Sequence, residues 1–244
     1  MTLAADPVRD AEYRSAALQV AEILRDRMMN IALSQNAMDS IANHGMVTSR
    51  ISIGFPEKLG IPPTEFLMNL QGASSRDRST AYFDARNMIV GLRLLPTDAQ
   101  EAAKTRSGRR ILQKFLISTF NKDRDIIVHE IIHMLDYLRG NITLSTTEAR
   151  YARVPKEQFR VLYVNSPEEF NALFQQGIVQ ITDLLNRFPK SSQRNILSSF
   201  DKFMEFTKKT STLVAMRRAL LPKFERKLDV RLWQTWNYLR ENMP

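Results

Sequence analysis

The 244-residue chain has no cysteine and only three histidines. Without cysteine it can form neither a disulfide nor a thiolate metal site, so its fold does not depend on an oxidising compartment. The first ten residues lack the apolar core of a secretory signal, and no later stretch is apolar over the length that crosses a bilayer. We therefore expect a protein with no membrane segment, located in the cytoplasm or packaged in a particle assembled there.

Acidic residues are fewer than basic ones, which gives a net charge of +9. A basic surface attracts polyanions. The C-terminal basic residues are, however, interleaved with apolar ones at the spacing of an amphipathic helix, which predicts solvated faces rather than a binding surface. A nucleic-acid partner is open but not favoured. The apolar residues expected to face the core there are Phe224, Leu228, Leu232, Trp233 and Trp236. The basic clusters are Arg106, Arg109 and Arg110, Lys208 and Lys209, Arg217 and Arg218, and Lys223, Arg226 and Lys227.

Two of the three histidines, His129 and His133, lie in the segment Ile-Ile-Val-His-Glu-Ile-Ile-His-Met-Leu-Asp at positions 126–136. At about 3.6 residues per turn they share one helix face, where both can bind one metal ion. Glu130 lies about 100° round the helix, beside the metal rather than on it. There it can take a proton from a metal-activated water that attacks a carbonyl, and pass it to the leaving nitrogen. This is the HExxH pattern of zinc peptidases.

Two nitrogens do not complete a catalytic zinc site, which usually has three protein ligands and an open position for water. No histidine follows Gly140, and His44 lies far upstream, where a helix end or the surface accounts for it. The remaining choice is a carboxylate. Asp136 shares the face of His133, but its short side chain lies a turn beyond the metal. We expect Asp136 to accept the other N–H of a ligating histidine, and a helix-face acid beside Arg139 is the alternative.

The better third ligand comes from residues 163–172, Tyr-Val-Asn-Ser-Pro-Glu-Glu-Phe-Asn-Ala, which predict the start of a second helix. Ser166 suits the N-cap and the proline after it suits the first helical position, so Glu168 and Glu169 fall in the first turn. We choose Glu169 because it precedes an alanine and a leucine on the side expected to pack inward. Glu168 is then a surface acid favoured by the helix dipole, and the reverse assignment stays open. The weaker candidates between the two motifs are Glu148 and Glu157.

These two motifs together resemble those of the glutamate-type zincin metallopeptidases, and more narrowly those of small metallopeptidase-like proteins encoded by bacteriophages. The resemblance covers roughly residues 79 to 185. It implies a Zn²⁺ cofactor held by His129, His133 and Glu169, with Glu130 as general base. The chain departs from the well-studied members because no further histidine is present to steady the transition state. Our candidate oxyanion donor is Tyr163, and the alternatives that the sequence does not rank against it are Tyr151 and Tyr137.

Hydrophobic spacing and turn residues predict the remaining elements. We expect a mainly helical α+β protein with a zincin-like core, a small antiparallel sheet and a C-terminal helical part. The expected regions are an N-terminal helical region and connector at 1–63, the metallopeptidase core at 64–188, and the C-terminal helices at 189–244. In the N-terminal half we expect helix from Asp6-Pro7 to about residue 42, a connector at 45–63, a short helix at 64–71 and a hairpin at 79–95 about an Asp84 to Asn87 turn. Helix then runs from Asp98 through 109–120 to a break at Asn121 to Asp123, after which the motif helix continues until Gly140 ends it. A loop with short strands is expected at 141–163, followed by three helical segments from Ser166 broken near Pro189 and Thr210.

The sequence therefore predicts a zinc metallopeptidase whose partner is a protein or peptide substrate. The hairpin could pair with that substrate by adding a strand, or could simply pack on the helices. The alternative function is a phage or particle-associated assembly protein, or one that contacts nucleic acid, with a structural or vestigial zinc site. Zinc content and peptide cleavage separate the two.

Overall fold

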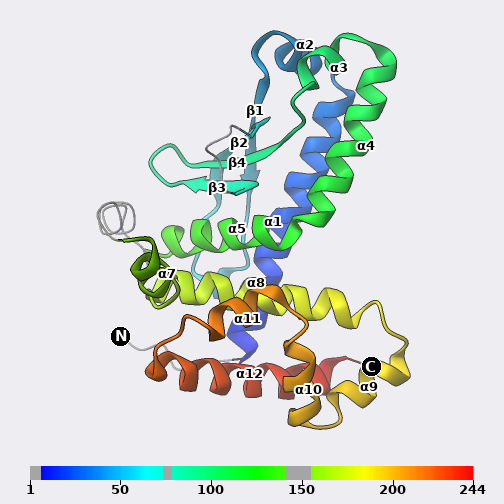
Figure 1. The fold of residues 1–244 in the computed structure, drawn as a ribbon. Coiled ribbons are helices and arrows are strands. Elements are labelled where there is room, and N and C mark those ends of the chain that lie inside the picture. Colours follow the sequence, from blue (N-terminus) through cyan, green and yellow to red (C-terminus); the bar gives the residue numbers. More distant parts are fainter. Residues whose placement is uncertain (1–6, 74–78, 141–154, 244) are drawn as a thin grey trace. The chain divides into compact units, whose positions relative to one another are not determined.

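The computed structural model describes residues 7–73, 79–140 and 155–243, and in this part the chain is mainly helical with one four-stranded sheet (Figure 1). This confirms the α+β class expected from the sequence. Two compact units are present, Ala16–Leu144 and the combination of Met1–Ser15 with Ser145–Pro244. Among the described residues, no helix is both long enough and apolar enough to cross a membrane.

The unit Ala16–Leu144 carries the sheet and the motif helix. Its core is formed by apolar side chains from both helices and strands, such as Leu24, Met28, Met68 and Leu92, each 0 % exposed. In chain order its elements are α1 (Pro7–Leu33), whose first residues belong to the other unit, then α2 (Gln35–His44), β1 (Met46–Ile53), the short 3-10 helix η1 (Glu57–Leu59), β2 (Thr64–Gly72), β3 (Ala81–Asp84), β4 (Ile89–Leu95), α3 (Ala99–Lys104), α4 (Arg106–Lys122) and α5 (Arg124–Leu138).

The strand order in the sheet is β1-β2-β4-β3. β1 pairs antiparallel with β2, and β3 pairs antiparallel with β4, as the predicted hairpin requires. β2 and β4 are parallel, so the prediction of a purely antiparallel sheet is wrong. The hairpin inserts β4 next to β2, and β3 is left at the edge of the sheet.

Two strands were missed in the N-terminal half. Residues 64–71 were expected to be a short helix, but they form β2, because Phe66, Met68 and Leu70 alternate inward with the period of a strand. The connector expected at 45–63 contains β1, in which Ile51 and Ile53 alternate in the same way and Ile51 lies opposite Phe66. Two or three alternating apolar residues are too few to distinguish a strand from a helical turn before the pairing partner is known.

The predicted boundaries of the motif helix are confirmed. α4 ends at Lys122, Asp123 separates it from α5, and α5 ends at Leu138. Gly140 follows in the left-handed conformation, with φ of 70°, and its N–H donates to the Tyr137 carbonyl. Glycine adopts this conformation without the steric cost that a Cβ would bring, so the chain turns away from the helix here.

The second unit is helical throughout its described part. After the segment 141–154, which lies outside the described residues, it contains α7 (Lys156–Val164), α8 (Pro167–Leu185), α9 (Lys190–Leu197), α10 (Phe200–Thr207), α11 (Ser211–Arg217) and α12 (Pro222–Asn242). The expected loop at 141–163 is therefore wrong for residues 156–163, which are helical. The predicted breaks near Pro189 and Thr210 are confirmed, and two more occur after Leu197 and after Arg217.

A core of large apolar side chains holds these helices together, with Phe170, Phe174, Phe203 and Leu228 each 0 % exposed. The first turns of α1 are tied to this unit by buried polar contacts. Arg231 on α12 forms an ion pair of 2.8 Å with Asp10, and Arg14 donates to the Gln175 amide oxygen at 2.9 Å. Burial lowers the pKa of Arg14 to about 10, although the Asp10 carboxylate acts in the opposite direction.

Candidate metal centre

His129 and His133 lie one turn apart on α5, as the motif spacing predicts. Their Nε2 atoms are 3.1 Å apart and the two rings meet edge to face, with centroids 4.7 Å apart. Two imidazole nitrogens bound to one tetrahedral zinc ion at about 2.0–2.1 Å would be about 3.3 Å apart. The histidine pair therefore has the separation that a shared metal ion requires.

The apolar surroundings of the pair explain why the helix holds this geometry. His129 is only 5 % exposed and His133 is partly buried, and the α5 residues Ile127, Ile131 and Ile132 are each 0 % exposed. Placing two imidazoles among such side chains is costly unless their polar atoms are satisfied. A metal ion bound to both Nε2 atoms would satisfy one nitrogen of each ring.

Glu169 lies in the first turn of α8. Ser166 caps the helix through its hydroxyl, which accepts the Glu169 N–H at 3.3 Å, and proline occupies the first turn as predicted. The two acids of this turn differ in burial, because Glu169 is 5 % exposed whereas Glu168 is only partly buried. The dipole of the helix favours an acid at either position, but it does not by itself explain the burial of Glu169.

His129, His133 and Glu169 together form a group that could hold a metal ion. Each offers one ligand atom, and these atoms all lie within 4.8 Å of one another. It is the only such group of three or more among the described residues of types His, Cys, Asp and Glu. Two nitrogens and one carboxylate oxygen are a donor set that suits a catalytic zinc ion and leaves a coordination position for water.

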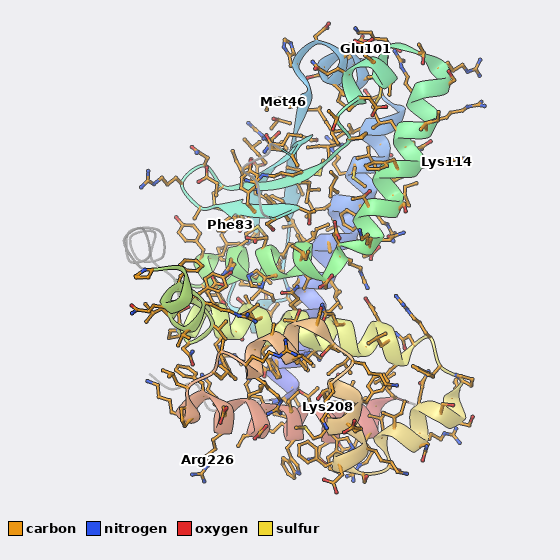
Figure 2. The ribbon with its side chains drawn as sticks, viewed as in Figure 1. Met46, Phe83, Glu101, Lys114, Lys208 and Arg226 are labelled. Carbon is orange, nitrogen blue, oxygen red and sulfur yellow. The ribbon has the colours of Figure 1, made fainter. Side chains whose placement is uncertain are left out.

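Glu130 is not part of this group. Its Oε2 atom accepts the backbone N–H of Phe83 at 3.1 Å, so the carboxylate is held against the edge strand β3. Figure 2 labels Phe83 on this strand. Glu130 is partly buried and is the immediate chain neighbour of His129. Glu130 is therefore outside the ligand group, and its role as a proton carrier stays a prediction.

The Phe83 contact was not predicted from the sequence. The hairpin was predicted, but every residue except proline carries the same backbone N–H, so the sequence gives no sign of which one meets Glu130. The ring of Phe83 also contacts that of Tyr137 on α5, with centroids 5.9 Å apart. Two contacts thus connect β3 to the motif helix, one through the backbone and one through a side chain.

The remaining predicted residues fall into three classes. Asp136 is on α5 and only 6 % exposed, and its role in orienting a histidine stays a prediction. Tyr163 lies near the end of α7, where its ring stacks on Phe159 with centroids 5.6 Å apart, and its role as oxyanion donor is also untested. His44 is exposed at the end of α2, as expected. The residues outside the described part are Tyr151 and Glu148, and the side chain of Glu157 is likewise not described.

Comparisons with protein-family models, with curated proteins and with solved structures find no match for this chain. The ligand group and Glu130 are therefore the observations that bear on function.

Proposed function

We propose that the protein is a zinc-dependent peptidase in which His129, His133 and Glu169 hold the metal. The observation that carries the proposal is the ligand group, because its three donors have the number and type found at catalytic zinc sites. A bound zinc ion would polarise a peptide carbonyl and acidify a water molecule. The other parts of the reaction fall to side chains and backbone of the protein.

Glu130 is the general base in this proposal. Its carboxylate accepts a proton from the attacking water as the water oxygen bonds to the carbonyl carbon. It then donates that proton to the amide nitrogen as the C–N bond breaks, so the carboxylate is regenerated in each cycle. The support for this role is its position next to His129 and outside the ligand group.

The edge strand β3 gives a site for an extended substrate. In the antiparallel pairing with β4, Tyr82 lies opposite Gly91, and the Arg93 N–H donates to the Thr80 carbonyl. Alternate residues of such a strand point their backbone groups toward the partner, so the polar groups of Ala81 and Phe83 point to the outer edge. Both outward N–H groups already donate, that of Phe83 to Glu130 and that of Ala81 to the Ser79 hydroxyl. A peptide that adds to this edge would replace the Ser79 contact and lie next to Glu130.

A protease screen on the metal-loaded chain tests the proposal. Purified protein would be stripped with a chelator, reloaded with zinc, and incubated with a denatured-protein mixture whose fragments are identified by mass spectrometry. We expect cleavage that requires zinc and stops on chelation. Full zinc loading without any cleavage of proteins or peptides would overturn the peptidase proposal and favour a structural site in an assembly protein.

A further inference from the structure

Nearly all of the net positive charge lies in the C-terminal helices. Residues 187–243 contain 13 Lys and Arg against 5 Asp and Glu, a difference of +8 within a chain whose total is +9. A field of one sign over so short a segment attracts a polyanion. Charge alone does not identify the partner, because a solvated helix face has the same composition.

Exposed apolar side chains on α12 show that its outer side is more than a solvated charged face. One side of this helix packs into the core through Leu228, Leu232 and Leu239, which are 0, 0 and 5 % exposed. Trp233 was expected to pack inward with them, and that expectation is wrong, because it is 51 % exposed. It follows Leu232 by one residue, about 100° round the helix, and therefore points away from the core. Val230, which lies on the same outer side, is 47 % exposed.

Three cations flank the exposed tryptophan. Arg226 and Arg240 lie seven residues before and after Trp233, which places them about 10 Å along the axis on either side and close to the same helix face. Lys223 lies on the first turn, and all three are exposed. Figure 2 shows Arg226 projecting away from α12. We call Lys223, Arg226, Val230, Trp233 and Arg240 the α12 outer face.

Within the described part of the chain, no acidic side chain forms an ion pair with the cations of the α12 outer face. No ion pair to Lys223, Arg226 or Arg240 is found among residues 7–73, 79–140 and 155–243. Asp229, by contrast, lies next to this face but pairs with Arg217 on α11 at 2.7 Å. Arg240 lies over the Trp236 ring, 4.7 Å from its centroid, and Lys223 lies 5.0 Å from the centroid of Phe224. These ring contacts do not cancel the charges, so the positive charge on either side of Trp233 is available to a ligand.

We propose that the α12 outer face binds single-stranded nucleic acid, with a base stacked on Trp233 and phosphates held by the flanking cations. An exposed aromatic ring between cations is the arrangement by which proteins hold unpaired bases without sequence preference. An anionic membrane surface fits less well, because binding there requires a broad apolar helix face. The apolar face of α12 is already used in the core, and only Val230 and Trp233 remain outside.

Fluorescence anisotropy with a labelled oligothymidylate and the full chain tests this proposal. Binding at about 50 mM salt should weaken at least about 5-fold in Trp233→Ala, which removes the stacking platform, and stay near wild type in Trp233→Phe. A duplex of the same length should bind more weakly, because its bases cannot stack on the ring. With three phosphate contacts, the slope of log K against log salt should be about −2 for a single strand.

Charge reversal supplies the matched control. The double variant Arg226→Glu, Arg240→Glu should lose most of the binding. The control is the double variant Lys114→Glu, Lys122→Glu, which changes the charge by the same amount at exposed positions of α4 and should reduce binding far less. Binding should not depend on zinc. The proposal is overturned if the wild type does not bind at low salt, if Trp233→Ala binds as tightly as the wild type, or if both charge reversals weaken binding equally. It is also overturned if anionic vesicles, but not oligonucleotides, bind in a Trp233-dependent way.

Discussion

The carboxylate of Glu130 accepts the backbone N–H of Phe83, the third residue of the edge strand β3, at 3.1 Å. A hydrogen bond to a charged group is stronger than one between neutral groups, so this contact fixes the Glu130 side chain against β3. The same strand edge is where an extended peptide would pair. In the proposed function, β3 would therefore position both the general base and the substrate.

Glu130→Gln should leave zinc affinity and folding close to wild type while peptide hydrolysis falls at least about 100-fold. Glutamine keeps the size of the side chain but cannot carry the proton, and general acid–base catalysis contributes at least that factor. Initial rates on a peptide from the screen, together with zinc content, provide the measurement. An active variant would contradict the mechanism, and loss of zinc would mean that Glu130 supports the metal.

Phe83→Pro should lower the hydrolysis rate about 10-fold, because proline removes the N–H that holds Glu130, and a hydrogen bond to a charged group contributes about 1.5 kcal/mol or more. The sheet should tolerate proline here, since the N–H of Phe83 points away from β4 and β3 is an edge strand. Phe83→Ala is the control, because it keeps the N–H and removes the ring. If the two variants have equal rates, the backbone contact has no role in positioning Glu130.

Glu169→Ala should weaken zinc binding far more than Glu168→Ala. The two acids are neighbours in the same helical turn, so the pair controls for charge and for the helix dipole. Only Glu169 belongs to the ligand group. Competition with a chromophoric chelator gives both affinities. Equal loss in the two variants, or a larger loss in Glu168→Ala, would show that the third ligand was assigned wrongly.

Gly91→Ala should destabilise the protein by about 1–3 kcal/mol, the usual cost of overpacking. A Cβ at this position on β4 would lie 1.9 Å from the Tyr82 ring. The Arg93 guanidinium packs over the same ring. Gly54→Ala is the control, because no atom lies within 4 Å of the added carbon. Urea unfolding gives the free energies. Adding Tyr82→Ala to the Gly91 variant should recover part of the loss, and equal stability of the two alanine variants would exclude this packing account.

The site was easier to predict than the sheet. The spacing of His129 and His133 fixes their relation because a helix has a constant geometry, and Ser166 followed by proline marks the start of α8 by local capping chemistry. The strands β1 and β2 have no comparable local sequence signal. They become strands by pairing with each other, with Phe66 opposite Ile51, which short alternating sequences do not reveal.

Trp233 shows the same limit on the surface. The apolar spacing of α12 predicted the helix and its buried face, and Leu228, Leu232 and Trp236 confirm it. A tryptophan next to that face could point either way, because a shift of one residue rotates it by about 100°. The packing of the core determines which way Trp233 points, and this packing cannot be predicted from the spacing of apolar residues in the sequence.

The metal site can be tested by measuring the zinc content of the purified chain by inductively coupled plasma mass spectrometry after zinc loading and desalting. We expect one zinc ion per wild-type chain and close to none in a His129→Ala, His133→Ala variant, because two of three ligands are then missing. A wild-type chain that retains no zinc, or a double variant that retains as much as the wild type, would contradict the metal site and the peptidase proposal that depends on it.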